Sequence, residues 1–434
     1  MTHQAALGPL VGDLRPLWRR FSDEGHRLYL VGGVVRDLLL GLPLGAADVD
    51  LTTDARPEVT RSIVAPLASA LWVQGERFGT IGAHVGRWSV EITTHRSEHY
   101  AATSRKPEVV FGRDLQVDLS RRDFTINAMA FELPTGPLHD PFGGRDDLGA
   151  RRLRTPLDPA ISFDDDPLRM LRAARFVARF GLQPDPELVA VATAAAGRLR
   201  IVAAERIHDE LERLLAAPDP AAGLRLLVTT GLLTQVLPDL GPVAGEADPR
   251  FRPGLRIDVV LQVLGSLVSP LARRVLLLWP LVEARGAEVV DRALVALRYP
   301  NAERVRTVAL SSALRRVLQA DEAAPALVRA LTVELGPDGS ELWALVAAMA
   351  PLALERGRLD EILSSRERLD AAGGSTSLAV PLDGRAVLAR LGCDPGPVVG
   401  EALAMLRDRI VRDGPLDRQG AFDELDRWWS QRTP

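Results

Sequence analysis

Residues 28–53 form the stretch that most constrains the fold of this chain. They read LYLVGGVVRDLLLGLPLGAADVDLTT, a pattern that predicts a strand, a tight turn at Gly32 and Gly33, a short helix and a second strand. A glycine turn that leads into a helix suits a phosphate group, because backbone N–H groups face the anion with no side chain in the way. Arg36, in the first turn of that helix, adds a positive charge beside the predicted phosphate site.

The second strand of this stretch carries two carboxylates. Asp48 and Asp50 are two residues apart, so strand alternation places both on one face. Their like charges repel unless a cation lies between them. Mg²⁺ is the natural cation, because it takes a few carboxylates and completes its octahedron with water and substrate phosphates. An isolated pair of this kind is more often a solvated strand end, but beside GGVVRD the metal-binding interpretation is favoured.

These two segments together resemble a known family. GGVVRDLLLG followed by DVDLTT is similar to the first motif of the class II tRNA nucleotidyltransferases, the CCA-adding enzymes, and of the bacterial poly(A) polymerases. Members of this family build or extend RNA 3′ ends without a template. The resemblance implies that Asp48 and Asp50 hold Mg²⁺ and that Gly33 and Arg36 help to grip a nucleoside triphosphate.

A third carboxylate follows on a neighbouring predicted strand. After a helix predicted at 57–70, short strands are predicted at 72–73, 80–85 and 88–94, and Glu91 lies in the last of them. A two-metal phosphoryl-transfer site needs such a carboxylate, to help hold one ion and to accept the proton of the attacking hydroxyl. The family resemblance extends to this position, just ahead of two threonines, and implies that Glu91 completes the catalytic triad.

A second motif, SRRDFTINAMAF, occupies residues 120–131. Arg121 and Arg122 precede Asp123, and residues 124–130 are predicted to form a helix. Paired arginines ahead of a helix can clamp a triphosphate, whereas the same letters alone would indicate a capped helix with its arginines in solvent. The whole motif resembles the second motif of the family nearly letter for letter, which implies that Arg122 binds the nucleotide.

Residues 95–107, HRSEHYAATSRKP, are polar and lack periodicity, so they are predicted to form a loop. The matching loop of the family reads R-x-E-x-x-Y-x-D-x-R-R-P. Four positions keep the family's spacing here, at Arg96, Glu98, Arg105 and Pro107. Three others differ, since Tyr100 stands one place early, Thr103 replaces Asp and Lys106 replaces the second Arg. The loop is altered but not shortened, which disfavours a relative that adds only cytidines.

Residues 162–180, SFDDDPLRMLRAARFVARF, predict a strongly helical segment with Pro167 in its first turn. Asp166 and Arg169 are three residues apart and are therefore expected on one helix face. Cytosine and adenine each offer an exocyclic amine beside a ring-nitrogen acceptor. A carboxylate and a guanidinium can read that pair, and they would be left unsatisfied against uracil or guanine. An exposed helical ion pair is the usual fate of such residues elsewhere.

This segment also resembles the EDxxR motif of the family, with Asp165 where Glu is usual. The resemblance implies that Asp166 and Arg169 select the base of the incoming nucleotide. Arg172 and Arg175, at the next two steps of three residues, are predicted to support the same nucleotide.

Composition and charge bound the class of protein. The chain has 434 residues, 47% of them hydrophobic and 25% charged, with a formal net charge of −4, so any nucleic-acid contact must come from a local basic surface. Cys393 is the only cysteine, which excludes intramolecular disulfides and cysteine-based zinc sites. No apolar run reaches the roughly 20 residues of a membrane-spanning helix, and no secretory signal pattern opens the sequence. We therefore expect a cytoplasmic protein without membrane contacts.

The rest of the chain predicts helices. From residue 220 onward it is rich in Leu, Ala and Arg with helical periodicity, and residues 381–410 resemble the C-terminal tail of the tRNA-handling members of the family. We predict an α+β fold, in which a small mixed β-sheet head is followed by an all-helical neck, body and tail. The predicted segments are the head 1–150, the neck 151–218, the body 219–372 and the tail 373–434.

The resemblance implies an Mg²⁺-dependent nucleotidyltransferase that uses CTP and ATP to add CMP and AMP to the 3′ end of tRNA. The 3′ hydroxyl would attack the α-phosphate in line. Two alternatives stay open, an A-adding enzyme that works beside a separate CC-adding enzyme, and a poly(A) polymerase, which the tRNA-type tail disfavours. A catalytically idle tRNA-binding protein is an alternative of a different class. Such a protein would be expected to lose a carboxylate or an arginine, and this chain has kept them all.

Overall fold

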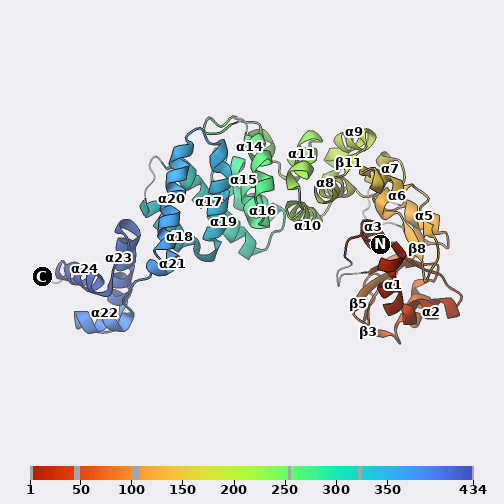
Figure 1. Ribbon diagram of the computed structural model, residues 1–434, viewed down its shortest axis with the longest axis horizontal. Coiled ribbons are helices and arrows are strands. Elements are labelled where there is room, and N and C mark those ends of the chain that lie inside the picture. Colours follow the sequence, from red (N-terminus) through yellow and green to blue (C-terminus); the bar gives the residue numbers. More distant parts are fainter. Residues whose placement is uncertain (1–2, 44–48, 100–107, 253–255, 321–324, 433–434) are drawn as a thin grey trace. The chain divides into compact units, whose positions relative to one another are not determined.

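The structure, a computed structural model, describes residues 3–43, 49–99, 108–252, 256–320 and 325–432. The chain divides into two units, Met1–Val236 and Leu237–Pro434. A mixed sheet and helices build the first unit, and helices build the second (Figure 1). The α+β prediction is therefore confirmed.

A seven-stranded sheet with the order β3-β4-β5-β2-β1-β8-β9 forms the centre of the first unit. Its strands are β1 Leu28–Val31, β2 Val49–Thr53, β3 Ala68–Trp72, β4 Thr80–Val85, β5 Trp88–Thr94, β8 Ala130–Glu132 and β9 Leu138–His139. Strands β2 and β5 pair in parallel, and the other neighbours in this sheet pair antiparallel. The strands that the sequence predicts at 80–85 and 88–94 are confirmed.

Strand β1 is buried on both faces, because apolar clusters cover both sides of the sheet centre. Leu30 belongs to a cluster that also contains Phe21 and Leu51, whereas Tyr29 and Val31 belong to a second one. The helices and 3₁₀ turns of this part are α1 His3–Asp13, α2 Arg15–Asp23, α3 Gly33–Leu39, α4 Pro57–Val64, η1 Glu76–Phe78, α5 Leu115–Ser120, η2 Thr125–Asn127 and α6 Gly144–Gly149.

Three predictions of local structure in the head are wrong. The helix predicted at 57–70 ends at Val64, and strand β3 begins at Ala68. The helix predicted at 124–130 is only the short turn η2, because residues 130–132 pair with β1 as strand β8. The first part of the predicted loop 95–107 is strand β6 Arg96–His99, which pairs antiparallel with β7 Glu108–Phe111. Residues 100–107 lie outside the described residues. Sheet pairing with distant residues overrides local propensity at these places.

The rest of the first unit contains a short parallel pair of strands, β10 Arg152–Leu153 and β11 Gln183–Pro184. Its helices are α7 Pro159–Asp165, α8 Arg169–Phe180, α9 Pro186–Ala195, η3 Ala196–Ile201, α10 Ala204–Leu215, α11 Pro220–Thr229 and α12 Leu232–Val236. The helical segment that the sequence predicts at 162–180 is broken between α7 and α8. Asp166 has extended backbone angles, φ −143° and ψ 97°, because the residue before a proline is pushed out of the α region.

Helices alone build the second unit as far as the structure describes it. They are α13 Leu240–Ala244, α14 Arg256–Val263, η4 Leu264–Ser266, α15 Pro270–Arg285, α16 Ala287–Ala296, α17 Asn301–Gln319, α18 Pro325–Leu335, η5 Gly336–Asp338, α19 Gly339–Met349, η6 Ala350–Leu352, α20 Arg356–Ala371, α21 Gly374–Ser377, α22 Gly384–Leu391, α23 Pro397–Asp413 and α24 Arg418–Ser430. The last three helices enclose an apolar cluster of their own, around Val387, Leu406 and Leu425. No helix in the described residues is long and apolar enough to cross a membrane.

Candidate active site

The glycine turn after β1 lies where two predicted site residues meet. Gly32 has a φ of +71°, and a Cβ built on it would lie 3.2 Å from Asp50 Oδ2 and 3.2 Å from Arg122 Nη1. The turn therefore requires glycine both for its backbone conformation and for the space that these two side chains take. Gly33, the predicted phosphate contact, opens α3 directly after this turn.

Asp50 and Glu91 are brought together by the sheet. They are register partners in the parallel strands β2 and β5, and Gly82 of β4 stands opposite Glu91 on its other side. Asp50 is half-buried and Glu91 is exposed, so both carboxylates border solvent. Asp48, the third predicted carboxylate, lies outside the described residues, and no group of three metal-ligating side chains is found among those that are described. Carboxylate oxygens are the donors that Mg²⁺ prefers, so the residues present fit that ion.

Asp118 anchors the arginines of the second motif, a role that the sequence alone does not show. Its buried carboxylate accepts from Arg121 Nη2 at 2.6 Å, Arg122 Nη2 at 3.4 Å and Thr52 Oγ1 at 3.2 Å. Burial disfavours the charged carboxylate, but Arg121 and Arg122 outweigh it and lower the pKa of Asp118. The guanidinium of Arg122 is thereby held beside Asp50, as its proximity to Gly32 shows.

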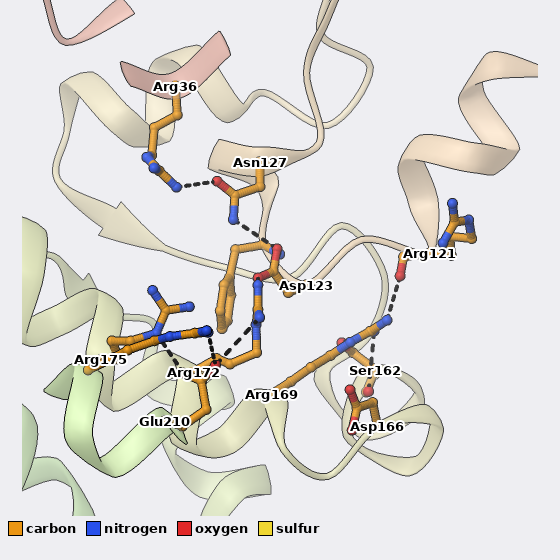
Figure 2. A network of polar contacts seen from close by, with 12 residues as sticks. Arg36, Arg121, Asp123, Asn127, Ser162, Asp166, Arg169, Arg172, Arg175 and Glu210 are labelled. Atoms are coloured by element: carbon orange, nitrogen blue, oxygen red, sulfur yellow. Dashed lines mark hydrogen bonds and ion pairs between the residues drawn. The ribbon is translucent and has the colours of Figure 1, made fainter. Parts of the chain in front are cut away.

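Arg36 lies beside the glycine turn, since a Cβ built on Gly33 would lie 3.3 Å from Arg36 Nη2. Its side chain is buried, with Nη1 donating to Asn127 Oδ1 at 2.7 Å and Nη2 to Asp37 at 2.7 Å. The guanidinium also lies 5.4 Å and 4.4 Å from the ring centroids of Phe176 and Phe180 in α8. Burial lowers the pKa of Arg36, against the attraction of Asp37. Arg36 thus joins Asn127 of the head (Figure 2) to the rings of helix α8.

Asp123 is the centre of a buried network that joins head and neck (Figure 2). Its carboxylate accepts from the backbone N–H of Phe124 at 2.8 Å, from Asn127 Nδ2 at 2.9 Å, and from Arg172 Nε at 2.9 Å and Nη2 at 2.5 Å. Although burial opposes ionisation, Arg172 and Asn127 hold the pKa of Asp123 far below its usual value. Asp123 is thus the partner of Arg172, a predicted nucleotide-binding residue.

Glu210 of α10 continues this network beneath the two neck arginines. Its buried carboxylate lies 2.6 Å from Arg175 Nε and 3.6 Å from Arg172 Nη1. Arg172 and Arg175 are therefore brought together, each fixed by a carboxylate. The sequence gives one signal for this, since Glu210 falls on the apolar face of a strongly amphipathic helix.

The sequence predicts Asp166 and Arg169 side by side on one helix face. They are not, because the break before Pro167 separates them. Asp166 accepts from Arg206 Nη2 at 2.8 Å and Nη1 at 3.3 Å. Arg169 instead donates to Ser162 Oγ at 2.8 Å and to the carbonyl oxygen of Arg121 at 2.5 Å (Figure 2). Both side chains still belong to one short stretch of the chain. Through Arg169 this stretch contacts the motif that contains Arg121 and Arg122.

Comparison with known proteins places these elements in context. The sequence model of the Poly A polymerase head domain matches residues 28–154, and that of the probable RNA and SrmB-binding site of polymerase A matches residues 181–242. The CCA-adding enzyme of Geobacillus thermodenitrificans (strain NG80-2) is 40% identical over 217 residues, which are 50% of this chain and 52% of that protein. The chain thus spans about half the length of the curated relatives it matches.

Solved structures match over nearly the whole chain. The crystal structure of the Bacillus stearothermophilus CCA-adding enzyme in complex with CTP has a TM-score of 0.70 and 27% identity, and the match covers 99% of this chain and 98% of that one. The Thermotoga maritima CCA-adding enzyme complexed with tRNA has a TM-score of 0.67 at 21% identity, with 96% and 94% covered. The latter likeness shows a shared fold.

Proposed function

We propose that this chain, which belongs to the family of class II CCA-adding enzymes and poly(A) polymerase heads, is a template-independent nucleotidyltransferase that adds CMP and AMP to the 3′ end of tRNA. The observation that carries the proposal is the meeting of Asp50, Glu91 and Arg122 beside the Gly32 turn. Two carboxylates and a guanidinium at one solvent-bordering edge suit a triphosphate and a metal ion. Relatives whose names carry the CCA-adding activity, and a matching structure that holds CTP, support the choice of substrates.

The described residues take distinct parts in this reaction. Arg122, fixed by Asp118, pairs with the triphosphate of the incoming nucleotide, and Gly33 leaves its backbone N–H open to the same phosphates. Arg36, beside Gly33 and held by Asn127 and Asp37, adds positive charge for the same phosphates. Glu91, exposed beside Asp50, accepts the proton of the attacking 3′ hydroxyl or helps to hold a metal ion.

We assign Mg²⁺ to Asp48 and Asp50, with Glu91 completing the set. When bound, such ions stabilise the charge on the phosphoryl oxygens. The carboxylates orient the site, and the parallel pairing of β2 with β5 fixes the spacing between Asp50 and Glu91. Removal of divalent ions with EDTA should stop nucleotide incorporation, and Mg²⁺ should restore it.

We also assign base selection to Asp166 and Arg169. The carboxylate would accept from the exocyclic amine of C or A, and the guanidinium would donate to the neighbouring ring nitrogen. Against U or G the carboxylate would face another acceptor and the guanidinium another donor, at a cost of about 1–3 kcal/mol per unsatisfied buried group. Arg206 meanwhile holds the carboxylate of Asp166 in its orientation. Arg172 and Arg175 support the nucleotide through the Asp123 and Glu210 network.

One experiment separates CCA addition from its neighbours. Purified protein is incubated with tRNAs that end one, two or three nucleotides short of the CCA end, each with CTP alone, ATP alone or both. CCA addition predicts that all three are extended to the full end and no further. Extension of only the tRNA that lacks its final A would indicate an A-adding enzyme, and long A tails would indicate a poly(A) polymerase. A protein that binds these tRNAs but extends none would refute the proposed activity.

A further inference from the structure

A cavity of about 550 Å³ lies in the first unit, at the C-terminal ends of helices α8 and α10. The wall that decides its chemistry consists of Arg175, Arg179, Arg213, Leu40, Leu42 and Phe180. Leu40 and Leu42 follow helix α3 and are 40% and 42% exposed. Three of the nine described lining residues are arginines and the other six are apolar, so no described residue of the lining is acidic.

The positive charge of this cavity exceeds the negative charge near it. Three arginines pair with the single carboxylate of Glu210. These are Arg175 at 2.6 Å, Arg213 at 3.6 Å and Arg172 at 3.6 Å. Within the described part of the chain, no carboxylate lies within ion-pair distance of Arg179, whose guanidinium rests 5.1 Å from the ring centroid of Phe180. After burial, repulsion from Arg179 is a further cause that lowers the pKa of Arg36. An anion in the cavity would relieve this excess.

The apolar residues of the cavity wall limit which kinds of anion would fit. Exposed leucines beside guanidinium groups suit a phosphate that is joined to a sugar and a base, as in nucleic acid, better than a free inorganic ion. Arg179 stands ten residues beyond Arg169 on helix α8, about 15 Å along its axis at 1.5 Å per residue. Gly33, the proposed contact of the incoming nucleotide's phosphates, lies beside Arg36, whose guanidinium is 4.4 Å from the ring centroid of Phe180, so an experiment has to distinguish an RNA phosphate from a free nucleotide.

We propose that Arg179 and Arg213 bind a backbone phosphate of the RNA strand in this cavity. The proposal rests on the proposed function and adds to it an RNA contact outside the reaction centre. The contact would position the acceptor without reading its sequence, since phosphates are common to all nucleotides. The alternative needs no ligand, because arginines in the last turn of a helix are stabilised by the helix dipole.

The test measures tRNA binding by the full chain in the absence of nucleotide, over a series of salt concentrations. The variants are Arg179→Gln, Arg213→Gln and the double variant, and Arg225→Gln serves as a control because this exposed arginine of α11 lies outside the cavity. Glu210 keeps Arg175 in every variant, so folding should be retained, which thermal unfolding checks. Each single change should raise the Kd for tRNA about fivefold and reduce the slope of log Kd against log salt by about one. The KM for ATP should stay within about twofold.

Three results would overturn the proposal. An unchanged Kd and an unchanged salt slope in the double variant would show that these arginines only stabilise the C-terminal ends of their helices. An equal effect of Arg225→Gln would show a diffuse charge effect instead of a site. A rise in the KM for ATP with unchanged tRNA binding would assign the cavity to the free nucleotide. If wild type binds tRNA with the expected variant effects but transfers no nucleotide, the phosphate contact stands and the proposed function fails.

Discussion

Asp50 and Glu91 stand opposite each other on the parallel strands β2 and β5, although 41 residues separate them in the sequence. The other pairs of this mixed sheet are antiparallel. The parallel pairing of these two interior strands brings the two carboxylates together beside the Gly32 turn. It also gives each carboxylate a distinct setting, because Asp50 is half-buried against the turn and Glu91 faces solvent.

Asp50→Asn should abolish nucleotide incorporation, by at least about a thousandfold, because it removes a charged metal ligand without opening the core. The matched control is Asp54→Asn, a carboxylate just after the same strand that bonds His26 and the backbone N–H of Arg27. The control should lower the unfolding temperature slightly and leave turnover intact. Single-turnover incorporation of labelled ATP with Mg²⁺ measures both. An Asp50→Asn enzyme with more than a small fraction of wild-type rate would contradict the metal assignment.

Glu91→Gln keeps the shape of the side chain and removes its charge. Because an acceptor of the attacking proton acts mainly in the transition state, kcat should fall about a hundredfold or more while the KM for ATP changes little. The exposed position of Glu91 makes a folding defect unexpected, and thermal unfolding checks this. Unchanged turnover would make Glu91 an ordinary strand residue.

Gly32→Ala and Gly25→Ala form a matched pair. Both glycines have positive φ angles, +71° and +76°. Gly32 also has a ψ of −135°, a region almost confined to glycine, so Gly32→Ala should lower the free energy of unfolding by about 1–3 kcal/mol and Gly25→Ala by about 1 kcal/mol. Only the Cβ at position 32 would press on Asp50 and Arg122, at 3.2 Å from each, whereas nothing lies within 4 Å of that at position 25. Nucleotide incorporation should fall strongly in Gly32→Ala alone. Equal activity in the two variants would show that the turn tolerates displacement of these side chains.

Asp166→Ala should weaken discrimination against UTP, because it removes one unfavourable contact with uracil and one favourable contact with adenine or cytosine. The ratio of kcat/KM for ATP to that for UTP should fall about tenfold or more on one matched tRNA. Asp164→Ala is the control, a more exposed carboxylate of the same segment that pairs with Arg198. Parallel loss of ATP and UTP use in Asp166→Ala would make Asp166 a structural partner of Arg206.

Asp118 links stability to pH. Its pKa is lower in the folded state, because Arg121 and Arg122 outweigh its burial, so folding favours the charged form. The resulting stability is fully present above the unfolded pKa of about 3.9 and is lost as the pH falls through the lower, folded value. Asp118→Asn should therefore lower the free energy of unfolding by about 3 kcal/mol at pH 7, and the difference from wild type should shrink below pH 4. Denaturant unfolding at pH 7 and pH 3 measures it, and a constant difference would contradict the assignment.

The sequence predicts the parts of the site better than their contacts. Spacing within a strand places strands 80–85 and 88–94 correctly, because alternation and glycine turns are local signals. It cannot show that Arg36 is buried against Phe176 and Phe180, since that contact depends on how a neck helix packs against the head. Nor does it show Asp118 as a buried anchor, because a carboxylate looks like a solvated residue until its partners are known, whereas Glu210 is indicated only by its place on the apolar face of its helix.

The break at Pro167 is a case in which a local signal points both ways. Proline is accepted in the first turn of a helix, but it also displaces the residue before it, and the structure follows the second rule at Asp166. Consequently Asp166 lies in the break between α7 and α8 and Arg169 at the start of α8, and each is held by its own partner. The division of the chain into head, neck, body and tail at the predicted boundaries stays a prediction.

The central place of β1 has a consequence for the protein as it leaves the ribosome. β1 is made from residues 28–31, but one of its two neighbours, β8, is made from residues 130–132. For about a hundred residues of synthesis, one edge of an entirely apolar strand has no partner, and such an edge invites pairing with other chains. Growing chains of this protein should accordingly depend on holdase chaperones until β8 emerges, and chains truncated just before residue 130 should aggregate whereas chains that extend through the neck should not.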